Sequence, residues 1–224
     1  FMRGTSRNWS AEAQLYAGMG YRVIEPEFRG STGYGAALFQ AGWRQWGRAM
    51  QDDLADTVAW AGNQGLIDPK RVCIVGASYG GYLTMMGLVK EPNLFRCGIN
   101  WVGVTDPEFM FSVTWTDFNE VDAARYSMEA MIGDPVKDAA QFNLTSPVKR
   151  ASEIKQPVLM AYGGLDRRVP VINGEKMKEA LEKNGRSVEW VVYNDEAHGW
   201  LKEENNVDFW SRVEAFLTKN LAPQ

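Results

Sequence analysis

The chain has 224 residues, of which 45% are hydrophobic and 23% are charged, and its formal net charge at pH 7 is -4. These values are ordinary for a soluble globular protein and exclude a disordered or fibrous chain, while the length suits one α/β domain over residues 1–224. The acidic balance and the lack of a basic run argue against a nucleic-acid partner, and no apolar stretch is long enough to cross a bilayer.

We expect the chain to begin in the middle of a helix-strand pattern. A helix capped by Ser10 and ended by Gly20 leads into an expected strand at 21–24, which is half of a crossover unit. We therefore expect a further strand before Phe1. The first residues have neither the charged nor the apolar region of a signal peptide, which favours a cytoplasmic location.

The glycine-rich loop at 29–35 is a weak match to a phosphate-binding loop, because it lacks the Lys-Ser/Thr pair of a P-loop and the G-x-G-x-x-G spacing. The helix expected over 48–63 has Asp52, Asp53 and Asp56 on one side, which we interpret as a solvated face rather than a metal site. With no Cys/His cluster and no calcium loop, we expect no metal and no cofactor.

Residues 76–82 read Gly-Ala-Ser-Tyr-Gly-Gly-Tyr, between a strand expected at 71–75 and a helix expected at 83–90. This is the strand-turn-helix context of a nucleophile elbow centred on Ser78. Side chains two residues before or after the serine would clash with the tight turn, and the glycines at both positions avoid this. The backbone N–H of Tyr79 is the predicted oxyanion donor.

Two further polar side chains follow predicted strands. Asp166 comes after a buried strand at 157–162, and His198, the single histidine, comes after a strand at 188–193. Parallel strands end at the same sheet edge, so both side chains are expected near Ser78. The order serine, acid, histidine is that of the α/β-hydrolases, and it predicts a catalytic triad.

Other carboxylates compete for the role of the acid. Asp195 and Glu196 are close to the histidine in sequence but share its loop, and Asp134 lies beside Pro135 in a helical region. Each triad residue taken singly has a plainer explanation as a turn, a helix cap or a solvated side chain. Their joint occurrence at three strand ends favours Asp166.

The remaining elements are expected as follows. Cys73 and Cys97 fall in neighbouring strands and are interpreted as buried free thiols, although paired strands also permit a disulfide. Helices are expected at 121–131, 136–142 and 172–184. A closing helix is also expected, with an inner face formed by Val207, Trp210, Val213 and Leu217.

The combined motifs resemble the catalytic domain of the prolyl oligopeptidase family of serine peptidases, nearest to its acylaminoacyl-peptidase and dipeptidyl-peptidase branch. The motifs that carry the resemblance lie at 28–35, 46–47, 52–53, 76–82, 163–170 and 196–199. The resemblance covers nearly the whole chain. It implies an α/β-hydrolase fold, with a mostly parallel sheet and helices on both faces, and cleavage of short peptides, acyl-amino acids or esters by Ser78, Asp166 and His198.

The resemblance also implies a substrate pocket beside the serine. An aromatic segment beyond the strand at 97–102 would form its wall, although the same rings could equally pack an inserted helix against the core. The predicted substrate-binding residues are Tyr82, Trp101, Val102, Phe109, Phe111 and Trp115.

Two departures from the family pattern concern the start of the chain. The N-terminal β-propeller and the His-Gly-Gly-Pro loop that supplies a second oxyanion donor are absent, so the chain resembles a truncated catalytic domain. Tyr162 also stands where the family often has histidine. The alternatives to a peptidase are a stand-alone carboxylesterase and a non-catalytic, partner-dependent fragment. An exposed sheet edge would favour a dimer.

Overall fold

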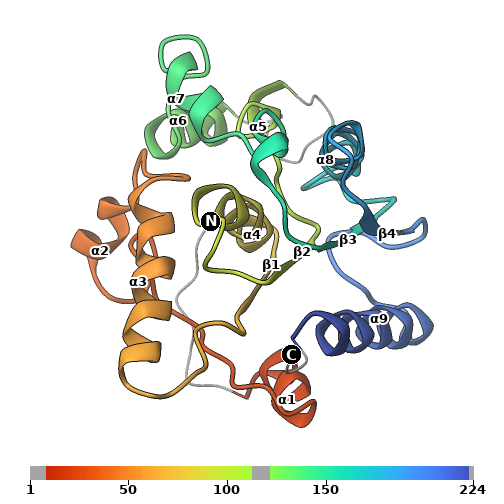
Figure 1. Cartoon of the computed structure of the whole chain (residues 1–224). Coiled ribbons are helices and arrows are strands. Elements are labelled where there is room, and N and C mark those ends of the chain that lie inside the picture. Colours follow the sequence, from red (N-terminus) through yellow and green to blue (C-terminus); the bar gives the residue numbers. More distant parts are fainter. Residues whose placement is uncertain (1–8, 113–121, 222–224) are drawn as a thin grey trace.

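The computed structural model describes residues 9–112 and 122–221, and for 122–126 only the backbone, and every structural statement below refers to this part of the chain. From β1 onward, one or more helices follow each strand, as Figure 1 shows. In chain order they are α1 (Ala11–Gly18), α2 (Ala36–Ala41), α3 (Ala49–Asn63), β1 (Cys73–Ala77), α4 (Tyr79–Lys90), β2 (Cys97–Trp101), α5 (Phe109–Ser112), α6 (Asp122–Met131), α7 (Ala139–Leu144), a short 3₁₀ helix (Ala151–Glu153), β3 (Val158–Gly163), α8 (Ile172–Lys183), β4 (Val188–Tyr193) and α9 (Glu203–Leu221).

The described strands form one parallel sheet in the order β1-β2-β3-β4. Every residue of β3 is buried, as is typical of a parallel strand covered on both faces, and its sequence is a nearly continuous apolar run. Ala77 pairs with Trp101 and Gly163 pairs with Tyr193, so the strands end together. The loops after β1, β3 and β4 therefore meet at one edge of the sheet, as predicted.

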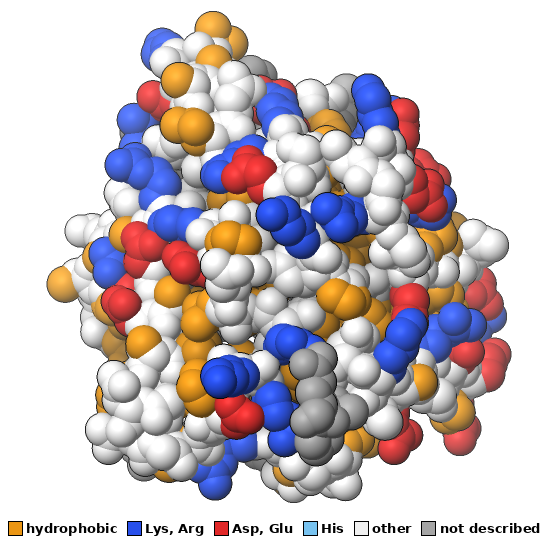
Figure 2. All heavy atoms as spheres, in the orientation of Figure 1, with side chains coloured by type: hydrophobic (Ala, Val, Ile, Leu, Met, Phe, Trp, Pro, Cys, Tyr) orange, Lys and Arg blue, Asp and Glu red, His pale blue; other side chains and the backbone are white. Residues whose placement is uncertain are grey.

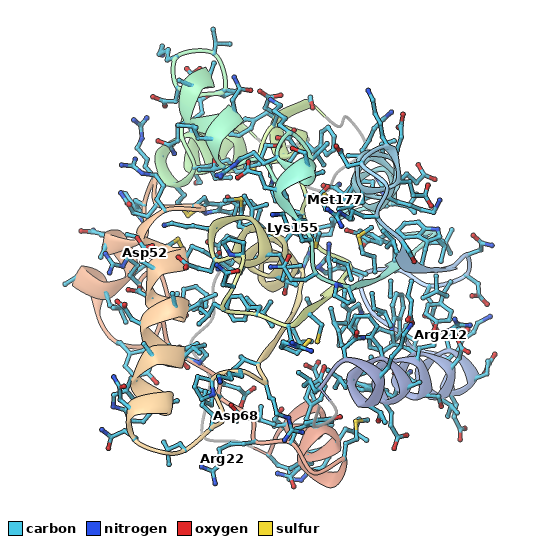
Figure 3. The ribbon with its side chains drawn as sticks, in the orientation of Figure 1. Arg22, Asp52, Asp68, Lys155, Met177 and Arg212 are labelled. Carbon is cyan, nitrogen blue, oxygen red and sulfur yellow. The ribbon has the colours of Figure 1, made fainter. Side chains whose placement is uncertain are left out.

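Helices cover both faces of this sheet (Figure 1), which confirms the expected α/β-hydrolase layering. One core cluster joins α3, α4 and α8 to the sheet, and Figure 3 shows Met177 of α8, a fully buried member of this cluster. The other cluster lies beneath α9, where the rings of Tyr16 of α1 and Trp210 pack edge to face with their centroids 5.4 Å apart. The sheet thus forms the middle layer of the fold and carries the loops of the site.

The strand expected at 21–24 is wrong, since residues 21–28 have no regular secondary structure. The segment has the composition of a strand, but a strand needs a hydrogen-bonded neighbour, and no described strand pairs with it. Tyr21 instead packs against the α9 side of the core. The helix before it is confirmed, and Ser10 Oγ accepts the N–H of Ala13 at 3.2 Å as the predicted cap.

The acidic side of α3 is only partly solvated, which corrects the prediction. Asp53 accepts hydrogen bonds from the backbone N, Nε and Nη2 of Arg29 at 2.9, 2.8 and 2.6 Å. Burial alone would raise the pKa of Asp53, but the bonds from Arg29 outweigh it and lower that pKa. Asp52, labelled in Figure 3, pairs with Lys90, whereas Asp56 is exposed. This face thus fastens the glycine-rich loop to α3.

The closing helix α9 uses a different inner face from the predicted one. Val213 and Leu217 are buried as expected, but Val207 is 60% exposed and Trp210 is half-buried. Phe209 lies inward instead, with Phe216 and Leu221. The expected helix at 136–142 also begins later, at Ala139, and α4 begins directly at Tyr79.

Cys73 and Cys97 are opposite each other on β1 and β2, and both are free thiols as predicted, but Cys97 is fully buried and Cys73 only partly. Burial raises the pKa of the Cys73 thiol, which its contact with Cys97 reinforces. On the face shown in Figure 2, acidic and basic side chains are interspersed. No helix in the described ranges is long and apolar enough to span a bilayer. Dimerisation through a sheet edge stays a prediction.

Candidate active site

The turn between β1 and α4 holds Ser78 in a strained backbone conformation, with φ 57° and ψ -117°. Such a conformation persists only where the surroundings enforce it. The N–H of Ser78 donates to the carbonyl of Trp101 at 2.9 Å, and its own carbonyl accepts from Tyr82 at 3.2 Å and from Val104 at 3.3 Å. These bonds on both sides fix the serine at the carboxyl end of β1 and the start of α4.

The two glycines around Ser78 differ in their roles. A Cβ on Gly76 would lie 2.3 Å from the backbone carbon and oxygen of Gly80, a contact that the backbone cannot relieve. A Cβ on Gly80 would meet nothing within 4 Å. The prediction that both glycines remove a clash is therefore right for Gly76 and wrong for Gly80.

The Gly76→Ala variant is expected to lower the free energy of unfolding by about 3 kcal/mol, because the added methyl overlaps the first turn of α4. The matched Gly80→Ala variant is expected to be neutral or to stabilise by up to about 1 kcal/mol through helix propensity. Urea unfolding followed by tryptophan fluorescence measures both. Equal losses in the two variants would contradict this account of the turn.

Asp166 and His198 are in direct contact, with His198 Nδ1 2.7 Å from Asp166 Oδ2. The Asp166 side chain is fully buried, whereas that of His198 is 22% exposed. The other carboxylate oxygen of Asp166, Oδ1, accepts hydrogen bonds from the backbone N–H groups of Arg168 at 2.8 Å and Val169 at 2.9 Å. Three hydrogen bonds thus orient the carboxylate toward the imidazole. No hydrogen bond joins the described side chains of Ser78 and His198.

The rival acids near the histidine have other partners. Asp195 pairs with Lys202, and Glu196 accepts the N–H groups of Leu201 at 2.9 Å and Lys202 at 2.8 Å, with a further bond from Asn205 at 2.9 Å. Burial opposes ionisation of Glu196, but these bonds outweigh it and lower its pKa. Glu196 therefore closes the loop that carries His198, a role that no motif in the sequence predicts.

The third rival, Asp134, caps its own turn. Backbone hydrogen bonds from Lys137 and Val136, together with the Lys137 side chain, lower the pKa of Asp134 to about 2. Gly163 explains how the loops of Asp166 and His198 come together, since a Cβ there would lie 2.1 Å from the carbonyl oxygen of Ala197. The N–H of Leu165 also bonds to the carbonyl of Glu196 at 2.9 Å.

Two of the predicted substrate-binding residues lie in the core. Tyr82 is completely buried, and its hydroxyl donates to the carbonyl of Thr145 at 2.9 Å. Its ring packs against Trp46 and Tyr79, behind the turn that holds Ser78. Trp101 packs beneath α9 in an aromatic cluster, with Phe209 at 4.8 Å. Direct substrate contact is therefore the wrong prediction for Tyr82, and Trp101 has a packing role.

The other predicted pocket residues are divided. Val102 is 2% exposed and belongs to the core beneath α9, so its burial also contradicts the pocket prediction. Phe109 and Phe111 are half-buried in α5, and Phe111 contacts Phe142 of α7 at 5.9 Å. Trp115 lies outside the described residues. Side-chain placement in this segment thus favours helix packing for Phe111. Phe109 stays a candidate for the pocket wall.

The comparisons with known proteins agree with this geometry. A family model described as prolyl oligopeptidase family matches residues 7–224. The chain belongs to the prolyl oligopeptidase family. It is 38% identical over 213 residues to dipeptidyl aminopeptidase BIII of Pseudoxanthomonas mexicana, covering 93% of this chain and 30% of that protein.

Other members of the family share the same region. Acylamino-acid-releasing enzyme 1 of Oryza sativa subsp. japonica is 27% identical over 220 residues, covering 94% of this chain and 27% of its own length. A solved puromycin-hydrolysing peptidase of Mycobacterium tuberculosis superposes with a TM-score of 0.79 at 26% identity, covering 88% of this chain and 29% of its own. The chain thus spans less than a third of the length of these relatives.

Proposed function

We propose that this chain is a serine hydrolase that cleaves amide or ester acyl bonds of short peptides and acyl-amino acids, with Ser78, His198 and Asp166 as its catalytic triad. The observation that carries the proposal is the 2.7 Å contact between His198 Nδ1 and the buried Asp166, on the sheet edge where strained Ser78 also lies. The names of the relatives, a dipeptidyl aminopeptidase and an acylamino-acid-releasing enzyme, support peptide substrates.

In this proposal His198 acts as a general base and then as a general acid. With Nδ1–H donating to Asp166, the neutral imidazole carries its free electron pair on Nε2, which takes the proton of the Ser78 hydroxyl during attack on the acyl carbon. The proton then passes to the leaving amine or alcohol. Water attacks the acyl-enzyme in the second half-reaction, again with His198 as the base, and releases the acid.

The start of α4 supplies one donor to the oxyanion. The N–H of Tyr79 has no hydrogen-bond acceptor within the described ranges, and it lies at the positive end of the helix directly after Ser78. A donor in this position stabilises the charge that develops on the substrate oxygen, an effect worth about 3 kcal/mol where single donors have been removed.

A substrate panel tests the proposed bond preference. We expect the chain to release p-nitroaniline from a dipeptidyl and an acyl-aminoacyl anilide, and p-nitrophenol from a short-chain ester, because one acyl-enzyme route serves all three. Rates of the Ser78→Ala variant are subtracted as background. Turnover of the ester alone would favour the carboxylesterase alternative, and turnover of none in a folded sample would contradict the proposal.

A further inference from the structure

Tyr162 of β3 is completely buried, and its phenol connects two neighbouring segments. The hydroxyl donates to the carbonyl of Gly103 at 2.7 Å and accepts from Asn100 Nδ2 at 3.1 Å. Asn100 is also fully buried, at the carboxyl end of β2. A hydrogen-bonded pair that is this deeply buried specifies geometry strongly, because either partner left alone carries an unpaired polar group.

Tyr162 bonds to residues 101–104, a segment that holds the backbone of Ser78 and that we call the serine clamp. Trp101 accepts the N–H of Ser78, and Val104 donates to the carbonyl of Ser78, so residues 101–104 bond to the serine backbone from both sides. Gly103 stands in the middle of this segment. The phenol of Tyr162 therefore lies one hydrogen bond away from the backbone that fixes Ser78.

The clamping segment is itself strained and tightly packed. Val102 has φ 43°, an unfavourable value for a β-branched residue, and its N–H donates to the carbonyl of Ala161 at 2.8 Å. A Cβ on Gly103 would lie 2.7 Å from Cα of Gly81 in the first turn of α4. Strain at Val102 and at Ser78 has to be held by surrounding contacts, and the bond from Tyr162 to Gly103 is one of them.

Tyr162 also belongs to the strand that carries the acid. Gly163 ends β3, and Asp166 follows three residues later. The ring is fixed from behind, where a Cβ on Gly174 of α8 would lie 2.4 Å from it and Trp190 of β4 packs at 5.4 Å. The Tyr162 ring, which is packed on both sides and lies on the strand before Asp166, is thus hydrogen-bonded to the serine clamp.

We propose that Tyr162 is a positioning residue, whose hydroxyl sets the backbone of residues 101–104 and thereby the attack geometry of Ser78. The inference rests on the proposed function and concerns a residue that touches no reacting atom. It gives a role to a position of which the sequence showed only that tyrosine stands where the family often has histidine. A loss of the hydroxyl is expected to lower kcat and leave KM nearly unchanged.

The test compares Tyr162→Phe with Tyr193→Phe. Tyr193 is a matched control, since it is buried on β4 and its hydroxyl donates to Asp208 at 2.7 Å, away from the serine clamp. We expect Tyr162→Phe to lower kcat and the rate of fluorophosphonate labelling roughly tenfold, with KM within about twofold. Tyr193→Phe is expected to keep both rates while losing similar thermal stability.

The outcomes separate this inference from the function on which it rests. A reactive wild-type chain with an equally reactive Tyr162→Phe variant overturns the inference alone, whereas a folded wild-type chain that reacts with neither ester nor fluorophosphonate overturns both. If Tyr162→Phe does not fold, Asn100→Ala removes the donor to the same phenol and is expected to lower kcat by a smaller factor. An unchanged kcat in folded Asn100→Ala then overturns the inference.

Discussion

Replacing Ser78 with alanine is expected to abolish turnover of esters and anilides, with kcat lower by about 10⁴-fold or more. Without the hydroxyl, no acyl-enzyme forms, and any residual rate comes from water activated in the same site. The backbone bonds of Ser78 to Trp101, Tyr82 and Val104 do not involve the side chain, so the variant is expected to fold as the wild type does.

Steady-state kinetics with a p-nitrophenyl ester measures this loss. Ser211→Ala is the matched control, since Ser211 is an exposed residue of α9 whose hydroxyl donates to the carbonyl of Val207 at 2.7 Å. We expect the control to keep wild-type kcat and KM. Full turnover by Ser78→Ala, with circular dichroism like that of the wild type, would remove Ser78 from the chemistry.

Replacing Asp166 with asparagine is expected to lower kcat by roughly 10³ to 10⁴-fold with little change in KM. The amide oxygen can still accept the N–H groups of Arg168 and Val169, so the loop keeps its shape. The amide nitrogen would then face His198 Nδ1 and donate to it, which places the imidazole proton on Nε2. A histidine protonated there cannot take the proton of Ser78.

Asp195→Asn provides the control for this change, because it alters a carboxylate in the histidine's own loop that pairs with Lys202 at the surface. We expect it to change kcat by less than about threefold, since exposed ion pairs contribute little. The measurement is kcat and KM for both variants at neutral pH. A larger effect of Asp195→Asn than of Asp166→Asn would show that Asp166 is not the acid of the triad.

Much of the fold could be predicted because buried parallel strands have a distinctive sequence. The apolar run of β3 identifies it as such a strand, and the glycines around Ser78 mark the turn into α4. The same composition misled at 21–24, because a strand is decided by a hydrogen-bonded neighbour and the local sequence does not contain that information. Boundaries such as the late start of α7 depend on tertiary contacts in the same way.

The sequence predicted which residues would form the candidate site, but not the buried contacts and hydrogen bonds that hold them in place. Strand order places Asp166 and His198 on one edge, and their contact follows from that topology. Burial could not be predicted for Tyr82, since an aromatic ring beside a nucleophile suits a pocket wall and a core equally well. The hydrogen bond from Tyr162 to Gly103 joins residues far apart in the sequence, and only the folded chain brings them together. The Glu196 side chain bonds within its own loop, to backbone N–H groups that no side-chain pattern marks.

The central claim is that Ser78 is an activated nucleophile, and covalent labelling tests it most directly. The folded chain is incubated with a fluorophosphonate, and the adduct is located by peptide mass mapping, with Ser78→Ala and His198→Ala treated in parallel. We predict one adduct on Ser78 in the wild type, none in Ser78→Ala, and strongly slowed labelling in His198→Ala. A folded wild-type chain that carries no adduct on Ser78, or that is labelled equally fast without His198, would contradict the account.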